Sequence, residues 1–287
     1  MEELPEELTP TQQEAQHVLQ CTLTKLLDPR SKYCSRYSRW IQRHTNLAEF
    51  CFRCIRPQVW EALQQGLNYD SVKAIAGEFD WQTRGVYYDV VMGKVDCLTR
   101  LYIGQSTNLR VRIRQHTDFR YRRDAPSLHY HALQKSKGNP FGVLCTLPSP
   151  TMGNHMLPGM DEPDLLLNLL EMWMCLVFRC LPKQTLQEWL PSGVETGGEI
   201  GSLNIQCPLD TWEGPGGKHE RVDLRNAEDP LAREWAEMKR AEWQGTQTKA
   251  KDTSPVAETR PFPVLPLLSG FVVGFLLCSY LKYGKGR

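Results

Sequence analysis

The sequence predicts an α+β fold, with a small β-sheet flanked by helices, a helical region before it, and a linker and one C-terminal transmembrane helix after it. Residues 85–92 are rich in β-branched and aromatic side chains, Gly93 and Lys94 can turn the chain, and a second apolar run follows over residues 101–104, so a β-hairpin is expected. Apolar residues recur at helical spacing before the hairpin, and a long uncharged run lies near the C-terminus. These three patterns divide the chain into zones of different physical character.

The overall composition excludes two classes of protein. The 34 lysines and arginines balance 33 aspartates and glutamates, for a net charge of +1, so the chain is not a generally polybasic binder. Hydrophobic residues make up 41% of the chain, which is enough for a packed core and too much for a wholly disordered protein. Residues 1–20 hold five glutamates and no lysine or arginine, the opposite of a targeting peptide. The ten cysteines are therefore expected to be reduced, in a cytosolic or nuclear setting.

The N-terminal part divides into an acidic leader, residues 1–9, and a helical region, residues 10–82. Thr9 followed by Pro10 is typical of a helix N-cap and a first helical position. Apolar residues then recur at helical spacing. The N-terminal helices are a candidate surface for a protein partner.

The middle of the chain, residues 83–210, is predicted to form the sheet-containing domain. After the hairpin, Asn108 is a suitable N-cap for a basic helix that ends near residue 120. The other expected elements are a short helix over 128–137, a strand over 141–147, an apolar helix over 164–180 and a short strand over 202–205. Beyond the domain we expect a loop and charged helix over 211–243 and a flexible linker over 244–263.

The C-terminal tail has the layout of a membrane anchor. No charged residue lies between Arg260 and Lys282, and residues 264–281 are long enough to span a bilayer, which takes about 20 apolar residues. A basic stub, residues 282–287, follows. The alternative is an apolar helix packed on the domain. A basic stub after a short anchor favours the mitochondrial outer membrane, with the endoplasmic reticulum or nuclear envelope as alternatives, and the domain would face the cytosol.

Two tripeptides stand on the predicted hairpin strands: Gly85-Val86-Tyr87 and Tyr102-Ile103-Gly104. Arg112 follows Tyr102 by ten positions and His116 lies one helical turn further on. In the same order come a glutamate within an apolar helix, Glu171, and an asparagine near the end of the domain, Asn204. Over about residues 83–210 this pattern resembles the GIY-YIG nuclease superfamily.

The resemblance implies an endonuclease that hydrolyses nucleic-acid phosphodiester bonds. Tyr87 would act as general base, Tyr102 would hydrogen-bond the phosphate or the attacking water, and Arg112 would grip the phosphate. Because the pKa of free tyrosine is near 10, that of Tyr87 would have to be depressed, or the group would act through water. His116 would shuttle a proton or contact phosphate. Glu171 would hold a single Mg²⁺ or Mn²⁺, and Asn204 completes the implied catalytic set.

Two observations support this site without the resemblance. Glu171 stands in a stretch, residues 165–178, that is otherwise nearly free of charge, and a buried carboxylate is costly unless it is paired or metal-bound. Residues 105–123 carry a net charge of +5, which fits contact with a DNA or RNA backbone, although a solvated helix face is the simpler explanation. Besides Arg112, the basic residues are Arg110, Arg114, Arg120, Arg122 and Arg123.

Three functional classes remain open: a membrane-tethered endonuclease, an inactive relative that binds nucleic acid or protein, and an adaptor in which the fold is a scaffold. Fifteen positions separate Tyr87 from Tyr102, so strand pairing has to bring them together. His129 and His131 flank Tyr130 and are either surface residues or part of the site. A zinc site is a minor alternative, on Cys51 and Cys54 with Cys34 and His44 nearby.

Overall fold

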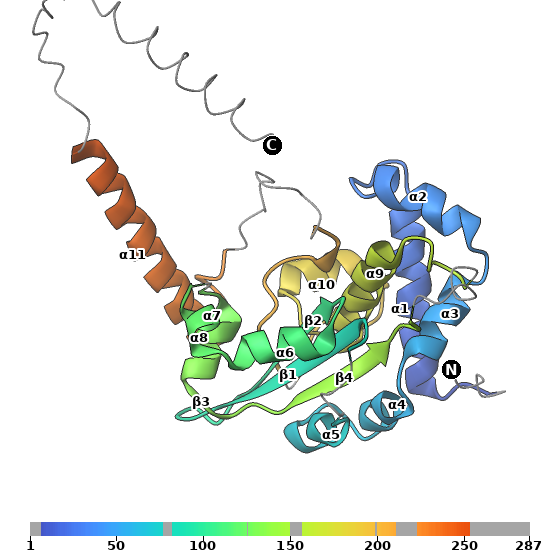
Figure 1. Ribbon diagram of the computed structural model, residues 1–287, viewed down its shortest axis with the longest axis horizontal. Helices are drawn as coiled ribbons and strands as arrows, with labels where there is room; N and C mark the ends of the chain where they lie inside the picture. The colour runs from blue at the N-terminus through green and yellow to red at the C-terminus, as the bar shows by residue number, and fades with distance from the viewer. Residues whose placement is uncertain are drawn as a thin grey trace, which may run out of the picture. The chain divides into compact units, whose positions relative to one another are not determined.

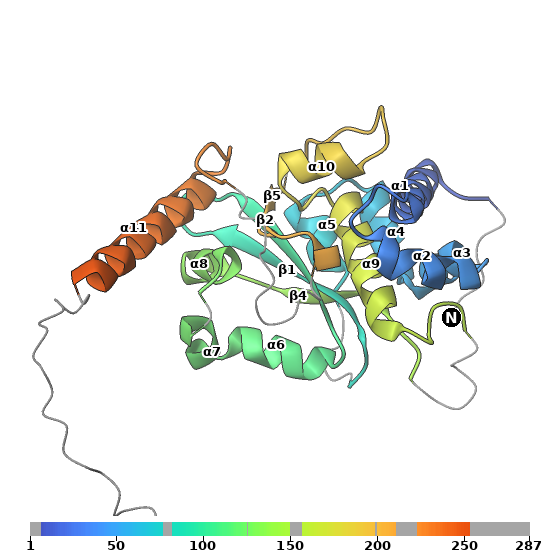
Figure 2. The same cartoon turned by 90° about the horizontal axis from the view of Figure 1, so that it is seen from above.

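The computed structural model describes residues 7–76, 82–124, 126–149, 157–198, 200–210 and 223–252 (Figure 1). Within these ranges the protein is a mixed α/β structure with eleven α-helices and one five-stranded sheet. Residues 7–240 belong to one compact unit, in which helices cover both faces of the sheet (Figure 2). The predicted combination of helices with a small β-sheet is therefore confirmed for the described residues, as a mixed α/β structure.

Five helices form the N-terminal region, as its periodicity predicts. The first begins with a capping box. The Thr9 side chain accepts a hydrogen bond from the Gln12 backbone amide, and the Gln12 side-chain oxygen accepts one from the Thr9 backbone amide. This confirms Thr9 as an N-cap and Pro10 as the first helical residue. The helices are α1 (Pro10–Leu27), α2 (Cys34–Arg43), α3 (Leu47–Cys54), α4 (Pro57–Gln64) and α5 (Tyr69–Ala74).

The expected hairpin forms the centre of the sheet. Its strands, β1 (Gly85–Gly93) and β2 (Thr99–Ser106), pair antiparallel with Tyr87 opposite Gly104 and Asp89 opposite Tyr102. The remaining strands are β4 (Phe141–Thr146) and β3 (Ser136–Gly138), both antiparallel to β1, and β5 (Gly201–Ser202), parallel to β2. The strand predicted over 141–147 is confirmed.

Helices of the second half flank this sheet. Figure 2 shows α6 (Leu109–Thr117), α7 (Phe119–Asp124) and α8 (Leu128–Gln134) along one side, and α9 (Pro163–Val177) with α1 along the other. The chain continues through α10 (Lys183–Trp189), a 3₁₀ turn at Pro208–Asp210 and α11 (Pro230–Asp252). Asn108 caps α6 as expected, because its side chain accepts from the Val111 amide at 3.0 Å.

Several elements differ from the sequence expectation. The strand expected over 202–205 is confined to β5 at Gly201–Ser202, because Asn204 bonds the Ile103 backbone through its side chain. The basic helix is two helices, because Asp118 takes an extended conformation and its carboxylate caps the Arg120 amide at 2.8 Å. The helix expected over 128–137 ends at Gln134 and gives way to β3, because β1 offers a pairing edge there. Helix α10 was not anticipated. The predicted linker begins too early, since α11 continues through residues 244–252 with few helix-breaking residues.

A hydrophobic core joins the N-terminal helices to the sheet. The side chains of Val86, Tyr88 and Val90 alternate onto one face of β1 and belong to the same cluster as α1, α3 and α9. Two hydrogen bonds fix this packing: Tyr88 donates to the Val72 carbonyl at 2.6 Å, and Trp173 donates to the Ala15 carbonyl at 2.8 Å. The opposite face of β1 carries Tyr87 in a smaller cluster under α6.

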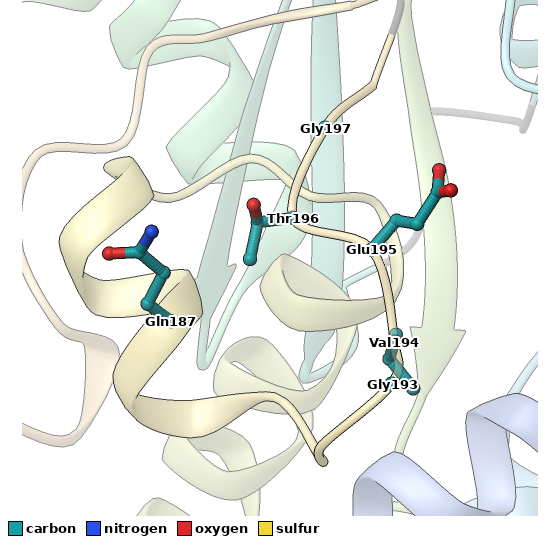
Figure 3. A pocket seen from close by; sticks show the side chains of 6 residues that line it. All are labelled: Gln187, Gly193, Val194, Glu195, Thr196 and Gly197. Carbon is teal, nitrogen blue, oxygen red and sulfur yellow. The ribbon is translucent and has the colours of Figure 1, made fainter.

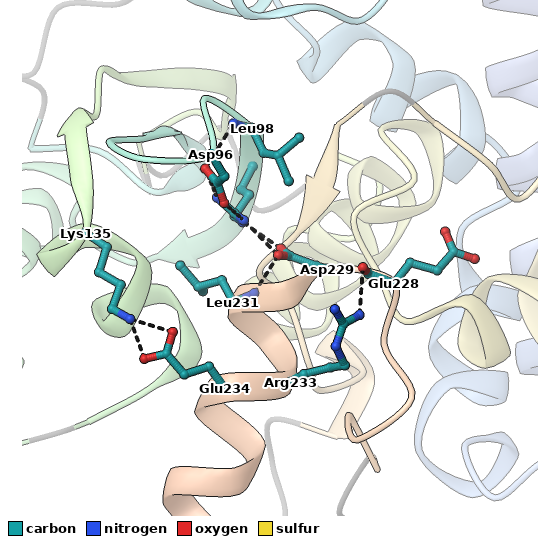
Figure 4. Close-up of polar contacts among 9 residues, drawn as sticks. Asp96, Leu98, Lys135, Glu228, Asp229, Leu231, Arg233 and Glu234 are labelled. Carbon is teal, nitrogen blue, oxygen red and sulfur yellow. Dashed lines mark hydrogen bonds and ion pairs between the residues drawn. The ribbon is translucent and has the colours of Figure 1, made fainter.

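A buried arginine, Arg100, ties the start of α11 to the hairpin, and Figure 4 shows its two carboxylate partners, Asp96 and Asp229. Arg100 on β2 is 1% exposed and forms ion pairs of 2.6 Å with both Asp96 and Asp229. Asp229 also accepts from the Leu231 amide at 2.9 Å, so it caps the helix as well. Lys135 on the loop after α8 adds an ion pair to Glu234 one turn further along α11. The first turns of α11 are thereby held to the sheet.

The predicted membrane anchor, residues 264–281, and the basic stub lie outside the described residues. Among the helices that are described, none combines the length and the apolar character needed to cross a bilayer.

We expect Asp229→Ala to lower the free energy of unfolding by about 2–3 kcal/mol, because it leaves the buried Arg100 with one partner and removes a helix cap. Asp124→Ala is the matched control, since Asp124 pairs with Arg123 at the solvent-exposed surface and its loss should leave stability unchanged. Urea unfolding followed by tryptophan fluorescence measures both. Equal unfolding curves for Asp229→Ala and the wild type would show that the contact between Asp229 and Arg100 does not stabilise the fold.

Candidate active site

The two tyrosines of the tripeptides meet on one face of the hairpin. Their ring centroids are 6.2 Å apart, although fifteen positions separate them in the sequence. The register explains this, since Tyr87 lies opposite Gly104 and so diagonal to Tyr102. Gly104 is required at this point, because a Cβ there would lie 2.5 Å from the Tyr87 hydroxyl oxygen. The glycine lets the Tyr87 ring lie across β2.

A chain of hydrogen bonds links Tyr87 to helix α6. The Arg112 Nε donates to the Tyr87 hydroxyl at 3.3 Å, the Tyr87 hydroxyl lies 2.6 Å from His116 Nε2, and His116 Nδ1 lies 3.0 Å from the Tyr130 hydroxyl. In the tautomer of His116 that is unprotonated on Nε2, the Tyr87 hydroxyl donates to that nitrogen. His116 then carries its proton on Nδ1 and donates it to Tyr130. Arg112 and His116 share this helix face because they are four residues apart.

Burial keeps the groups of this chain in their neutral forms. It lowers the pKa of His116 to about 2, with help from His129 and Arg112. It also raises the pKa of Tyr87 well above 10 and that of Tyr102 to about 12, while the positive charge of Arg112 acts in the opposite direction on both. The expected depression of the Tyr87 pKa is therefore absent in the protein alone, because desolvation of the phenolate outweighs the attraction of Arg112.

A second buried pair, not anticipated as a unit, supports Tyr102. His129 on α8 stacks on the Tyr102 ring, with centroids 4.1 Å apart and planes 5° from parallel. Its Nε2 lies 2.8 Å from Oδ2 of Asp89, whose side chain is fully buried on β1. The signal in the sequence that could have revealed this pair is Asp89, a carboxylate within an otherwise apolar strand. Of the two histidines left open, His129 belongs to the site, whereas His131 lies 3.6 Å from Glu234 on α11.

Glu171 reaches the site from α9. Only 9% of it is exposed, and burial raises its pKa to about 8, opposed by a hydrogen bond from Gln105 and by the charge of Arg112. The Gln105 amide also donates to Asn168, one turn before Glu171, and Asn168 donates to the Tyr37 hydroxyl at 3.2 Å. A hydrogen-bonded chain therefore runs from α2 to the carboxyl group. Sequence reasoning missed the half-buried Gln105 and the buried Asn168, because the partner of a neutral amide is set by distant segments and leaves no local signal.

The donor set around Glu171 fits a divalent cation of the Mg²⁺ type. Burial disfavours its charged form, so a bound cation would stabilise the deprotonated carboxylate. Mg²⁺ needs only one or two carboxylates when waters and a substrate phosphate supply the remaining oxygens. No group of three or more His, Cys, Asp or Glu residues in the described ranges is arranged to hold a metal. Burial raises the pKa of Cys51 and of Cys54, which disfavours the thiolates that zinc needs.

Asn204 lies beside the site but is turned toward the backbone. Its Oδ1 accepts from the Ile103 amide at 2.8 Å and its Nδ2 donates to the Ile103 carbonyl at 2.6 Å. Both polar ends of the side chain are thus used next to Tyr102. In this arrangement Asn204 positions β2.

The basic residues occupy α6 and α7 but differ in their surroundings. Arg114 and Arg120 are exposed and form no ion pair within the described part of the chain, whereas Arg123 pairs with Asp124 at 2.7 Å. Arg122 is half-buried and its charge lowers the pKa of His129, after burial and Arg112. Arg110 is half-buried as well. Of the five further arginines in the predicted phosphate-binding surface, Arg114 and Arg120 are therefore exposed without an ion pair to a described residue.

A pocket elsewhere on the surface contains none of the predicted site residues. Figure 3 shows it between α10 and the loop that follows, with only one ionisable side chain, Glu195, in its wall. The lining residues are Gln187, Gly193, Val194, Glu195, Thr196 and Gly197. The reactive groups are gathered on the hairpin and α6 instead.

We expect Glu171→Gln to stabilise the metal-free protein increasingly as the pH rises. Between the ordinary carboxyl pKa of 4.5 and about 8, the folded protein holds a proton that the unfolded chain has released, so the free energy of unfolding falls with pH. A glutamine has no such proton, so the difference from the wild type should grow by up to ~1.4 kcal/mol per pH unit and level off above pH 8.

Urea unfolding in EDTA at several pH values measures this difference. Glu61→Gln, at an exposed position of α4, is the control and should follow the wild type at every pH. A constant difference between Glu171→Gln and the wild type from pH 5 to 9 would show that Glu171 is not desolvated.

No family model, no curated protein and no solved structure matches the chain in comparisons with known proteins.

Proposed function

We propose that the protein is a divalent-metal-dependent endonuclease of the GIY-YIG type that hydrolyses DNA or RNA phosphodiester bonds. The observation that carries the proposal is the hydrogen-bonded chain from Arg112 through Tyr87 to His116, with the desolvated Glu171 within electrostatic reach of Arg112 and Tyr87. This arrangement brings together a cation that can bind phosphate, a phenol that can exchange a proton and a carboxyl group that can bind a metal. Phosphodiester hydrolysis uses groups of these three kinds to stabilise the transition state and to activate water.

Arg112 is held in an orientation that leaves part of its guanidinium available. Nε donates to Tyr87, and Nη1 donates to Gln115 at 3.2 Å and to Tyr121 at 3.0 Å. Nη2 has no hydrogen-bond partner among the described residues. It can therefore bind a phosphate oxygen without losing the contacts that fix the side chain, and the guanidinium stays charged when buried.

The proposed proton route follows the hydrogen bonds. Tyr87 would take a proton from the attacking water as it passes its own proton to His116 Nε2, so the phenol remains neutral throughout. His116, now protonated on both nitrogens, keeps its Nδ1 bond to Tyr130. Burial disfavours both a free tyrosinate and a doubly protonated His116, so the route requires the negative charge of a bound phosphate to stabilise the imidazolium. A cation held by Glu171, Mg²⁺ or Mn²⁺, would neutralise charge on the phosphate when bound.

A second candidate function is a GIY-YIG-like scaffold that binds nucleic acid or a protein partner without cutting. One observation favours it: the Tyr87 side chain is fully buried, so a water molecule reaches its hydroxyl only if neighbouring groups shift. Tyr102, by contrast, is partly exposed on the same face.

Either function would be exercised at a membrane, through residues 264–281. The uncharged run between Arg260 and Lys282 supports this part of the proposal. We place the domain on the cytosolic side of the mitochondrial outer membrane, with the endoplasmic reticulum and nuclear envelope as alternatives.

We expect the full chain to cleave at least one member of a panel of single-stranded, duplex and branched DNA and RNA in Mg²⁺ or Mn²⁺. Arg112→Ala and Glu171→Ala should lower the rate by about 10²–10³-fold or more, because each removes charge stabilisation of the transition state. Arg53→Ala is the control, since Arg53 is surface-exposed on α3 and paired with Glu49. A folded wild type that binds the panel and cuts none of it would support the scaffold instead.

We expect alkaline carbonate extraction to leave the full chain in the membrane fraction, because an apolar span of this length does not partition into water. A chain ending at residue 255 should move to the supernatant. Release of the full chain under the same conditions would refute the anchor.

A further inference from the structure

Beside Arg112 lies an aromatic ring that the proposed chemistry does not use. Tyr121, on α7, is 36% exposed. Its hydroxyl accepts from Arg112 Nη1 at 3.0 Å, and the guanidinium carbon lies 5.9 Å from the ring centre. On the protein side, Tyr130 meets Tyr121 edge-on, at 6.4 Å and 86°. The Tyr121 side chain therefore contacts Arg112 and Tyr130, and part of the residue still faces solvent.

Exposed arginines stand close to this ring in the sequence, since Arg120 directly precedes Tyr121 and Arg114 lies two positions after Arg112. Arg114 on α6 and Arg120 on α7 are exposed and unpaired in the described structure, and the nearby acid Asp124 is taken up by Arg123. Asp118, between the two helices, caps the Arg120 amide through one oxygen. Exposed arginines interleaved with an aromatic ring are the combination used to bind unpaired nucleic acid, with phosphates on the cations and bases on the rings.

From this juxtaposition we propose that Tyr121 is a base-stacking platform, so that the site selects nucleic acid with an unpaired nucleotide next to the phosphate held by Arg112. The inference rests on the proposed function, because it takes Arg112 as the phosphate ligand. In one nucleotide only the sugar separates base from phosphate, so adjacent groups on the protein can hold both.

The requirement for an unpaired nucleotide follows from the geometry of stacking. Inside a duplex, neighbouring base pairs cover both faces of every base, so a base reaches a protein ring only after it leaves the stack. Leaving the stack costs a few kcal/mol in a paired duplex and least in a strand that is already single. Stacking on an aromatic side chain returns about 1–3 kcal/mol per base. Single-stranded and branched substrates therefore gain from Tyr121, whereas an intact duplex does not.

Three variants separate stacking from the other roles open to Tyr121. Tyr121→Ala removes the ring. Tyr121→Phe keeps the ring but loses the bond to Arg112, so it isolates any role in orienting the arginine. Phe119→Ala is the control, because Phe119 is a more exposed aromatic, at 65%, on the same helix and has no ring or hydrogen-bond contact with Arg112 in the described structure.

The test measures binding of the full chain in EDTA, so it does not depend on cleavage. The probes are a short thymidine oligonucleotide with one 2-aminopurine, its uridine counterpart, a fully abasic strand of equal length and a blunt duplex. The wild type should quench 2-aminopurine and bind the single strands more tightly than the abasic strand. Tyr121→Ala should weaken binding of the base-containing strands by about 5- to 100-fold and leave the abasic strand unchanged. Tyr121→Phe and Phe119→Ala should bind like the wild type.

Several outcomes would overturn the inference. An equal loss on the abasic strand, or a loss in Tyr121→Phe as large as in Tyr121→Ala, would show that Tyr121 only orients Arg112. Equal affinity of the wild type for duplex and single strand would remove the selectivity. If stacking holds and no nucleic acid is cut, the proposed endonuclease fails while the platform stands. If the protein cleaves nucleic acid but binds base-containing and abasic strands equally, only the base-stacking role of Tyr121 is refuted.

Discussion

The close contact between the Tyr87 ring and Gly104 is the constraint on which the site depends. The antiparallel register places these residues opposite each other, and the missing Cβ lets the phenol lie across β2. From there its hydroxyl meets both Arg112 and His116 of α6. A side chain at position 104 would push the Tyr87 ring away from α6 and interrupt the hydrogen bonds that link Arg112, Tyr87 and His116. The glycine thus acts through close approach of two strands, while its backbone conformation is ordinary.

The site concentrates groups whose charged forms are disfavoured by burial. His116, His129, the two tyrosines and Glu171 all shift toward neutrality, and Arg112 is the charged group at their centre. Such an arrangement is electrostatically incomplete without a ligand, because one cation faces a carboxyl group that is protonated near neutral pH. A substrate phosphate and a divalent cation would supply opposite charges at adjacent points. The phosphate would favour a protonated His116 and the cation would favour a Tyr87 phenolate, two charged forms that burial alone disfavours.

The N-terminal helices are joined to this chemistry through the shared core. Trp173 of α9 donates to the carbonyl of Ala15 in α1, and Asn168 of the same helix donates to Tyr37 in α2. Asn168 in turn accepts from Gln105, which hydrogen-bonds Glu171. The N-terminal helices are therefore connected by hydrogen bonds to the Glu171 carboxyl group. On the far side of the sheet, Arg100 and Asp229 hold the start of α11 in the same unit.

Local patterns by themselves determined the hairpin, the caps at Thr9 and Asn108, and the spacing that puts Arg112 and His116 on one helix face, because each depends on neighbours within a few residues. They could not determine contacts between distant segments. The Asp89–His129 pair, the chain from Tyr37 to Gln105 and the use of Asn204 on the Ile103 backbone were decided by tertiary packing alone. The same is true of the raised pKa of Tyr87. A pKa in a folded protein depends on how much water the fold removes, and that amount is a property of the packed structure.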